Sequence, residues 1–252
     1  DESLRRAADV VLYGEAAGDE AGVSVALAGD VTGDGVSDLL IGAWGNDTAG
    51  ADAGAAYLLS GPVSGVVALA AADVIWTGVA ADDGAGYALS GAGDVNGDGI
   101  DDLLIGGPFS GTLLNGTAWL VLGSTSATGT LSLAGAEASF TAEAEGDLAG
   151  VTVASAGDVN ADGLDDLLIG ATDYDSVGVV YVVLGPASGA IALGSADARL
   201  LGDAAGDAAG AGIAGLGDLD NDGYDDIIVG ISGESTAASG AGATALLMGG
   251  GL

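Results

Sequence analysis

GDVNGDGIDDLLIG, the segment Gly93–Gly106, decides the fold because close variants of it occur four times in the chain. The other copies begin at Gly29, Gly157 and Gly217, so that successive copies are 64, 64 and 60 residues apart. Self-similarity at a nearly fixed period is typical of solenoids, propellers and other repeat architectures. The chain is therefore expected to be built from one repeated structural unit.

Similarity between the copies extends well beyond the acidic segment. In the second copy it includes ADVIWTG from Ala72 upstream and GTAWLVLG from Gly116 downstream, and both have counterparts in the other three copies. No linker or second domain remains between the copies. We therefore predict a single domain over residues 1–252, made of four repeats with approximate bounds 8–71, 72–135, 136–195 and 196–252.

Each repeat contains four short apolar runs bounded by Gly, Asp, Asn or Ser. In the second repeat these runs are Asp73–Thr77, Gly86–Ala92, Asp102–Gly106 and Thr117–Leu122. Their length and their Val, Ile, Leu and aromatic content indicate strands, and frequent Gly opposes the helical propensity of Ala. Four strands in a repeat of about 60 residues are typical of a propeller blade. We predict an all-β fold, a β-propeller of four-stranded blades that forms a four-bladed ring or part of a larger ring or assembly.

The two ends of the sequence predict how such blades would be joined. The sequence opens on the upstream strand, at Ala8–Tyr13, and its last predicted strand is the downstream one, at Thr244–Met248. The last unit then lacks a fourth strand and the first unit brings a spare one. Pairing these two would close a ring, whereas pairing between molecules would give a two-chain ring or a filament. Small residues on the predicted inner strands favour a narrow ring, although the whole chain is rich in Ala and Gly: Ser24, Ala26, Ala88, Ser90, Thr152, Ala154, Gly212 and Ala214.

The acidic segments follow the pattern Asp-x-[Asn/Asp/Thr]-x-Asp-Gly-x-x-Asp, which suits a calcium ion. Ca²⁺ takes about six to eight oxygen ligands, and a short loop can supply them from alternate residues. Gly99 follows the third donor of the second loop, where the chain must turn sharply. We predict about four Ca²⁺ sites. The predicted donors, with the backbone carbonyl at the fourth position of each set, are Asp30, Thr32, Asp34, Val36 and Asp38; Asp94, Asn96, Asp98, Ile100 and Asp102; Asp158, Asn160, Asp162, Leu164 and Asp166; and Asp218, Asp220, Asp222, Tyr224 and Asp226.

Two other calcium motifs do not fit these loops. An EF-hand needs a Glu at its twelfth position, where Ile105 stands in the second loop, and a calcium-binding β-helix needs tandem nine-residue repeats. A plain Asp- and Gly-rich hairpin turn is the remaining alternative, but it does not explain four loops with one register or the repulsion among their carboxylates. Because Thr32 replaces Asn or Asp, the first site should bind most weakly, and the extra charge of Asp220 should make the fourth site the tightest.

These loops, and the Leu-Leu-Ile-Gly strands that follow them, resemble the FG-GAP repeats of the integrin α-chain β-propeller over nearly the whole chain. Gly106–Pro108 is the nearest match to the Gly-Ala-Pro part of that motif, and the Phe-Gly part is degenerate. The resemblance implies calcium in the hairpin between the first two strands of a blade, where the ion stiffens the propeller and performs no chemistry. It also implies an extracellular or cell-surface protein. Propellers of this family usually have seven blades, so four copies are a departure.

Composition excludes several classes of function. The chain has 37 Asp plus Glu against 3 Lys plus Arg, a net charge of −34, and contains no Cys or His. Such a surface repels nucleic acid, and no apolar stretch approaches the ~20 residues of a membrane span. Zinc sites built from Cys or His and Ser-His or Cys-His catalytic pairs are impossible. An enzyme would be left with carboxylate chemistry or metal-activated water, so we predict a non-catalytic protein.

A partner would bind on the face opposite the acidic loops. Trp44, Phe109 and Tyr174 recur at near-equivalent positions there, where they would either form a ligand rim or cover gaps between blades. An aspartate also recurs on this face. It would either bind a cation or a basic partner, or cap the turn into the next strand. The four residues are Asp19, Asp83, Asp147 and Asp207. The leading interpretation is a secreted adhesion or structural module that binds a protein or glycan, or associates with itself through its terminal strands. The alternatives are a lectin and, less favoured, an extracellular hydrolase or lyase.

Overall fold

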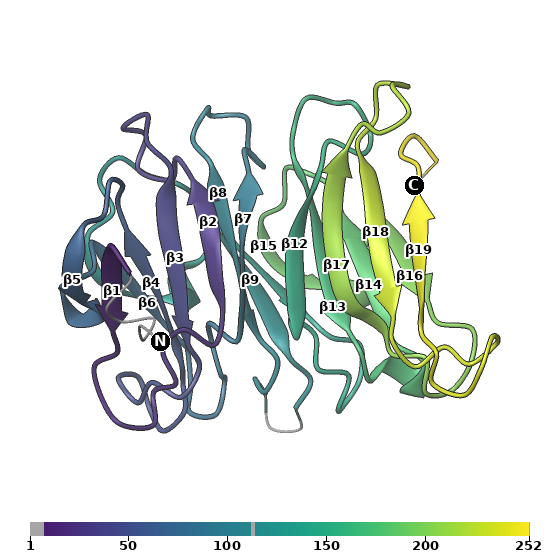
Figure 1. Ribbon diagram of the computed structural model, residues 1–252, viewed down its shortest axis with the longest axis horizontal. Coiled ribbons are helices and arrows are strands. Elements are labelled where there is room, and N and C mark those ends of the chain that lie inside the picture. Colours follow the sequence, from purple (N-terminus) through teal and green to yellow (C-terminus); the bar gives the residue numbers. More distant parts are fainter. Residues whose placement is uncertain (1–7, 112–113, 252) are drawn as a thin grey trace.

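The chain is all-β in the computed structural model, which describes residues 8–111 and 114–251 (Figure 1). Helical structure in these residues consists of four single turns of 3-10 helix: η1 (Leu69–Ala71), η2 (Leu133–Gly135), η3 (Tyr174–Ser176) and η4 (Leu193–Ser195). None of the described residues forms a helix that is long and apolar enough to cross a membrane. The predicted fold class is confirmed, and the strands of the second repeat begin and end within two residues of the predicted runs.

The strands form a row of mainly antiparallel sheets, which we number along the chain. Sheet 1 contains, in spatial order, β10 (Gly129–Ser132), β6 (Val74–Thr77), β4 (Ala55–Leu59), β3 (Asp38–Ala43) and β2 (Val25–Gly29). Sheet 2 contains β15 (Gly189–Ala192), β11 (Ala138–Thr141), β9 (Thr117–Val121), β8 (Asp102–Gly107) and β7 (Ala88–Gly93). Sheet 3 contains β12 (Thr152–Gly157), β13 (Asp166–Ala171), β14 (Val179–Val183) and β16 (Ala198–Leu201). Sheet 4 contains β17 (Ala209–Gly217), β18 (Asp226–Ile231) and β19 (Ala243–Leu247).

Sheets 1, 2 and 3 each take their outer strand or strands from the following repeat of the sequence. The fourth strand of sheet 1, β6, pairs antiparallel with β4 although it opens the second repeat, and β10 of the same repeat adds a parallel fifth strand outside it. The equivalent strands β11 and β15 complete sheet 2. The sequence repeats are therefore offset from the sheets by one strand, and this exchange links each sheet covalently to the next. The fifth strands were not predicted.

Neighbouring sheets contact each other through their innermost strands. β2 packs beside β7, β7 beside β12 and β12 beside β17. The small residues predicted for these strands permit this approach: Ser24 Oγ donates a hydrogen bond to Gly86 O at 2.7 Å, and Thr152 Oγ1 donates to Gly210 O at 2.7 Å. The interior between the sheets is filled by large apolar side chains, and Tyr57 and Tyr181 are completely buried.

The row of sheets is an open arc in which the two ends of the chain lie far apart (Figure 1). The remaining strands, β1 (Val10–Tyr13) and β5 (Gly65–Ala68), form a parallel two-stranded sheet beside sheet 1. Among the described residues β1 does not pair with β19, which lies at the opposite end of the arc. The ring closure within one chain that the sequence left open is thus not seen in this structure. The large groups of buried apolar residues are likewise divided along the arc, from sheet 1 to sheet 4.

Gly106 provides a test of the sheet-to-sheet contact. A Cβ at this position would lie 2.1 Å from the backbone oxygen of Gly150, in the segment just before β12 of sheet 3. We expect Gly106→Ala to lower the free energy of unfolding by about 2–3 kcal/mol, because the two backbones would have to separate. Gly212→Ala is the matched control, since a Cβ there meets nothing within 4 Å and the equivalent residue of β7 is already Ala88. Equal urea denaturation midpoints for the two variants would contradict this account.

Candidate metal centre

The four acidic loops lie along one edge of the arc, the upper edge in Figure 1. Each joins the first two strands of its sheet: β2 to β3, β7 to β8, β12 to β13 and β17 to β18. In every sheet the strand before the loop shifts register at its end, for example between Gly91 and Gly93. Gly93 and Gly99 have φ angles of 75° and 85°, which favour glycine, so the loop is shaped by the backbone as well as by its carboxylates.

The first aspartate of each loop organises the turn through backbone hydrogen bonds. Oδ1 of Asp94 accepts from the N–H groups of Gly97 and Asp98 at 2.8 and 3.0 Å, and Oδ2 accepts from Gly99 at 2.8 Å. Asp30, Asp158 and Asp218 accept equivalent bonds in their loops. The four loops therefore share one conformation, as their common sequence register predicted.

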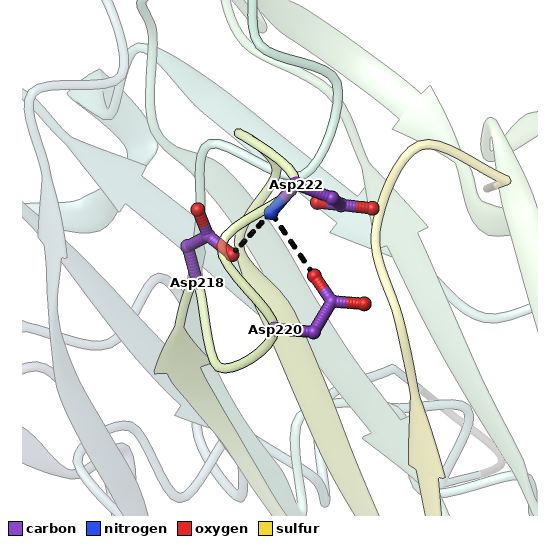
Figure 2. A group of neighbouring side chains, drawn as sticks. All are labelled: Asp218, Asp220 and Asp222. Atoms are coloured by element: carbon purple, nitrogen blue, oxygen red, sulfur yellow. Dashed lines mark hydrogen bonds between the residues drawn. The ribbon is translucent and has the colours of Figure 1, made fainter.

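The fourth loop brings three carboxylates together (Figure 2). Asp218, Asp220 and Asp222 each offer an oxygen, all within 4.8 Å of one another, and all three side chains are exposed. The backbone N–H of Asp222 donates to Asp218 and to Asp220, at 3.1 Å in both cases. Loss of surrounding water, followed by the neighbouring charge of Asp222, raises the pKa of Asp220 above its usual value. A divalent cation would relieve the repulsion within this group.

In the second and third loops an asparagine occupies the middle of the site. Asn96 Oδ1 accepts from the N–H of Asp98 at 2.8 Å, while Nδ2 donates to Asp98 Oδ2 at 3.0 Å. Asn160 and Asp162 repeat this arrangement. At this position the second and third loops thus hold a neutral amide that donates to the neighbouring carboxylate, where the fourth loop has the carboxylate of Asp220.

Thr32 supplies an independent check that the first loop suits a cation. Its Oγ1 atom is buried and has no hydrogen-bond partner among the described residues. An unpaired buried hydroxyl is costly, and such an atom calls for an explanation such as an ion or a water molecule. Thr32 stands at the second donor position, which predicts that this oxygen faces the ion. The donor chemistry of the loops therefore fits calcium.

The last aspartate of each loop has a role that the sequence did not reveal. Asp102 is fully buried, and its two oxygens accept hydrogen bonds from the backbone N–H groups of Val95 (3.0 Å) and Gly123 (2.8 Å). Asp38, Asp166 and Asp226 are equally buried and hold the same two segments of their own sheets. Burial raises the pKa values of Asp102 and Asp166 to about 6. These aspartates clamp the loop to the turn after the third strand, whether or not they also touch an ion.

A second aspartate, just before the clamp, connects neighbouring sheets. Asp101 Oδ2 accepts from the backbone N–H of Asp30 in the preceding sheet at 2.7 Å, and Asp165 and Asp225 do the same for Asp94 and Asp158. Sequence reasoning missed this contact, although the Asp-Asp pair that opens the strand in repeats two to four was a visible signal. Repeat one has Ser37 in this place.

Side chains of the predicted ligand face occupy the opposite edge of the arc. The rings of Trp44 and Phe109 meet edge to face with centroids 5.8 Å apart, and Tyr87 packs against Phe109 at 5.3 Å. Trp44 and Phe109 line a cleft of about 600 Å³ together with Asp82 and Asp83. Tyr174 does not join them, because its ring packs against Tyr181 at 6.4 Å.

The four repeated aspartates of that face are buried turn caps in this structure. Asp83, 4 % exposed, accepts from the N–H groups of Val79 and Ala80, both at 2.8 Å. Asp19, Asp147 and Asp207 accept equivalent bonds in their turns. Burial raises the pKa values of Asp83 and Asp147. Of the two readings of these residues, the geometry favours capping.

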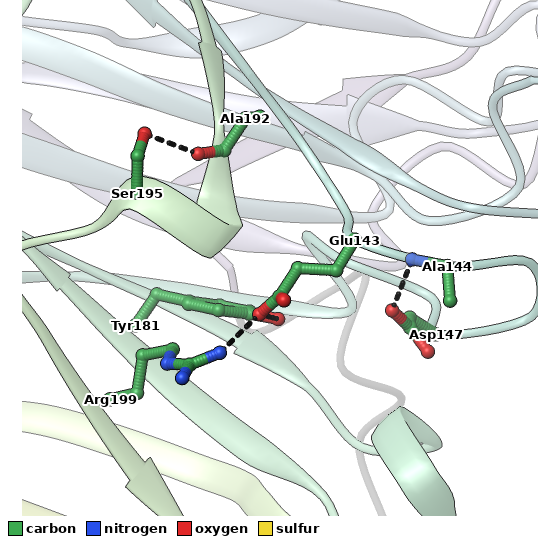
Figure 3. Close-up of polar contacts among 7 residues, drawn as sticks. All are labelled: Glu143, Ala144, Asp147, Tyr181, Ala192, Ser195 and Arg199. Atoms are coloured by element: carbon green, nitrogen blue, oxygen red, sulfur yellow. Dashed lines mark hydrogen bonds and ion pairs between the residues drawn. The ribbon is translucent and has the colours of Figure 1, made fainter.

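The basic residue among those described is also committed to a structural contact (Figure 3). Arg199 Nη1 lies 2.7 Å from Glu143 Oε1, which also accepts a hydrogen bond from the hydroxyl of Tyr181 at 3.2 Å. Burial and the neighbouring carboxylate of Glu143 raise the pKa of Tyr181 above its usual value. This group holds the outer strand β16 against the loop that precedes sheet 3.

Comparison with known proteins agrees with this architecture. The FG-GAP repeat family matches residues 85–127, 149–183 and 209–247, the inner strands and acidic loops of sheets 2, 3 and 4. Three segments of the chain therefore match FG-GAP repeats. Residues 21–59 form sheet strands and an acidic loop of the same kind. The chain is also similar to human integrin alpha-IIb, with 46 % identity over 81 residues, which are 29 % of this chain and 8 % of that protein. The fold is consistent with an integrin-like β-propeller.

Proposed function

We propose that this protein is a secreted, calcium-binding FG-GAP propeller module with a non-catalytic adhesion or structural role. Four loops of one conformation present oxygen donors along one edge, and the group Asp218, Asp220 and Asp222 supports the proposal most directly. Thr32 Oγ1, buried and unpaired, supports the same function for the first loop. We further propose that residues 1–252 act as one domain and that the predicted donors of all four loops bind calcium.

The experiment for this proposal is native mass spectrometry of the whole chain, titrated with Ca²⁺ after EDTA treatment. We expect four ions to bind, and Asp98→Ala to remove one of them. Asp82→Ala is the matched control, because Asp82 is an exposed carboxylate outside the loops. Mass spectra without bound calcium at millimolar concentration, or equal stoichiometry for the two variants, would overturn the proposal.

A partner of the module would be a protein or a glycan, and the cleft beside Trp44 and Phe109 favours this surface as its binding site. Its lining combines two aromatic rings with the exposed carboxylate of Asp82, beside the buried turn cap Asp83. Aromatic faces and fixed hydrogen-bond acceptors are used by lectins as well as by peptide-binding modules. Retention on a glycan array that Trp44→Ala abolishes would assign a lectin, and turnover of a bound glycan would assign the hydrolase or lyase alternative.

A further inference from the structure

Sheets 1 and 3 each contain a hydrogen-bonded tyrosine–glutamate pair, which joins the third strand of the sheet to the loop before its innermost strand. In sheet 1 the hydroxyl of Tyr57 donates to Glu15 Oε1 at 2.8 Å. In sheet 3 the hydroxyl of Tyr181 donates to Glu143 Oε1 at 3.2 Å, and Arg199 contacts the same carboxylate (Figure 3). The same place between strand and loop is therefore filled by polar side chains in both sheets.

Among the described residues sheet 2 has no such pair, and a cleft opens at this place. Trp119 replaces the tyrosine, Val79 replaces the glutamate and Ser139 replaces Arg199. Because valine offers no acceptor to the indole N–H, these side chains do not close the gap with a hydrogen bond. The cleft has a volume of about 500 Å³, and its described lining extends from Val79 to Ala190, well inside the chain. We call it the hydroxyl cleft.

Hydroxyl groups line one wall of the hydroxyl cleft. Thr117 and Trp119 of β9 lie opposite Thr141 and Ser139 of β11, so these four side chains share one face of sheet 2. The buried Ser110 Oγ donates to Thr117 Oγ1 at 2.6 Å. Two hydroxyls carry two protons, and this bond uses one of them. No acceptor among the described residues takes the other proton, so it is available to a ligand in the cleft.

Asp83 lies at the junction of the hydroxyl cleft with the cleft beside Trp44 and Phe109, because it lines both. We call the second one the aromatic cleft. The side chain of Asp83 is 4 % exposed, and both hydrogen bonds from its turn, donated by Val79 and Ala80, go to Oδ2. Its Oδ1 accepts no hydrogen bond from the described residues. A carboxylate oxygen is therefore left as an acceptor where the two clefts meet.

Comparison with the first repeat shows why this carboxylate lacks a side-chain partner. The equivalent Asp19 accepts a hydrogen bond from Asn46 Nδ2 at 3.3 Å. Ser110 stands at the position of Asn46, and its hydroxyl donates to Thr117 instead of Asp83. An acceptor without a partner is costly in a carboxylate that is almost fully buried, so a donor supplied by a ligand is favoured there.

We propose that the two joined clefts bind an uncharged oligosaccharide, whose hydroxyl groups donate to Asp83 Oδ1 and accept from the Ser110–Thr117 pair. A sugar ring has an apolar C–H face that packs against aromatic rings such as that of Trp44, and each of its hydroxyls both donates and accepts. The cleft volumes of about 500 and 600 Å³ lie within the range of about 300–1,000 Å³ for ligand pockets. This inference rests on the glycan partner proposed above and assigns its chemical class, but it does not depend on calcium in the loops.

Charged ligands fit the same surface less well. Acidic ligands are repelled by the exposed carboxylates of Asp52 and Asp82 in the aromatic cleft, and the described lining of both clefts contains no basic residue. A lysine or arginine side chain of a partner has donors alone. It satisfies Asp83 but leaves the remaining hydroxyl proton of the Ser110–Thr117 pair without an acceptor. A sugar hydroxyl satisfies both groups.

A glycan array that carries uncharged and acidic oligosaccharides tests the ligand class, with the whole chain applied in millimolar Ca²⁺. We expect uncharged glycans alone to be retained. By isothermal titration calorimetry the affinity for a retained glycan should change less than twofold between about 20 and 500 mM NaCl, because no ion pair is screened. Retention of acidic glycans, or displacement of the glycan by tetralysine with a tenfold loss of affinity in salt, would overturn the proposal.

Native mass spectra of the same samples keep this inference apart from the calcium proposal. A chain that binds four calcium ions but retains no glycan overturns the saccharide site and leaves the calcium-binding module intact. A chain that retains uncharged glycans without binding calcium supports the saccharide site and overturns the calcium proposal.

Closing the hydroxyl cleft tests its location. Val79→Glu combined with Trp119→Tyr restores the pair that fills sheets 1 and 3, so we expect the affinity for the retained glycan to fall at least tenfold while the urea midpoint is unchanged or higher. Val66→Glu is the matched control for the added charge, because Val66 is 73 % exposed and lies outside both clefts. It should bind the glycan like the wild type. Equal affinities of the double variant and Val66→Glu would contradict the proposed site.

Asp83→Asn separates the ligand contact from the turn cap. Asp147 caps the equivalent turn in the third repeat, where Tyr181 and Glu143 fill the place of the cleft. Both Asp83→Asn and Asp147→Asn should lower the urea midpoint, because both change a buried cap. Only Asp83→Asn should lower the glycan affinity, by at least tenfold. Equal glycan affinities of these two variants would show that Asp83 is not the acceptor for the sugar.

Discussion

Removal of calcium with EDTA should lower the melting temperature of this protein by about 20 °C or more. Each site held at about 100 times its dissociation constant adds roughly 2.7 kcal/mol to the free energy of unfolding, and four sites add about 11 kcal/mol. A domain of this size shifts its melting temperature by about 2–4 °C per kcal/mol. The effect is large because stabilities of whole domains are only about 5–15 kcal/mol. Differential scanning calorimetry in EDTA and in millimolar Ca²⁺ measures it.

The source of this effect is the arrangement of carboxylates that the fold imposes. Asp218, Asp220 and Asp222 hold oxygens within 4.8 Å of one another without a basic side chain in the loop. Two like charges about 4 Å apart repel by up to about 4 kcal/mol at an effective dielectric constant near 20. A bound divalent ion converts this repulsion into attraction, and only the folded loop can gather enough oxygens to hold it.

Variants in single loops measure how much each site contributes to the difference between the calcium and EDTA melting temperatures. Asp98→Ala should reduce the difference between the calcium and EDTA melting temperatures by about a quarter, and Asp82→Ala should leave it unchanged. Because Thr32 replaces Asn or Asp in the first loop, that loop should be the first to lose its ion as Ca²⁺ is lowered. Identical melting curves in EDTA and Ca²⁺ would contradict ion binding as a source of stability.

Strands and acidic loops could be predicted from the sequence because both are local. Asp102–Gly106 is apolar after its first residue, lies within strand limits and follows a Gly-containing turn, so its structure depends little on the rest of the chain. The fifth strands could not be predicted in this way. All four residues of Gly129–Ser132 are on the exposed side without an alternating burial pattern, and this segment forms a strand by pairing with the edge of β6.

The sheet to which each strand belongs, and the closure of the ring, could not be predicted from the sequence for a different reason. A periodic sequence reads the same at any starting point, so nothing in it tells that β6 belongs to the sheet of β4 and not to that of β7. Closure depends on the rotation between neighbouring sheets, which close backbone contacts such as Gly42 against Gly86 determine. Such contacts are visible only in three dimensions.

The predicted donors of each set lie in one loop of the structure, and the last member of each set has a structural role that its residue type alone does not indicate. In the motif Asp102 is one more carboxylate, with the same spacing in all four repeats. The structure shows both of its oxygens engaged by the buried N–H of Val95 and by the N–H of Gly123. The sequence cannot show this, because one partner lies 21 residues away in another turn.

Replacement of Asp102 should therefore destabilise the protein even when no calcium is present. Asp102→Ala leaves two backbone donors without partners, and each unsatisfied buried group costs about 1–3 kcal/mol, so a loss of about 2–6 kcal/mol is expected. Asp102→Asn keeps one acceptor oxygen and removes a buried charge, which should limit the loss to about half of that value. Urea unfolding in EDTA at pH 7.5 measures both variants without a contribution from bound ions.

Asp98→Ala is the control for these measurements, because Asp98 belongs to the same loop but is exposed. In EDTA it should cost less than about 1 kcal/mol, although it weakens calcium binding in the second loop. Equal losses for Asp98→Ala and Asp102→Ala in EDTA would show that the clamp adds nothing to the loop. The calcium affinity of Asp102→Asn then separates the two roles of this residue: an unchanged affinity leaves Asp102 as a clamp alone, and a tenfold weaker one makes it a ligand as well, since the isosteric amide preserves the shape of the loop.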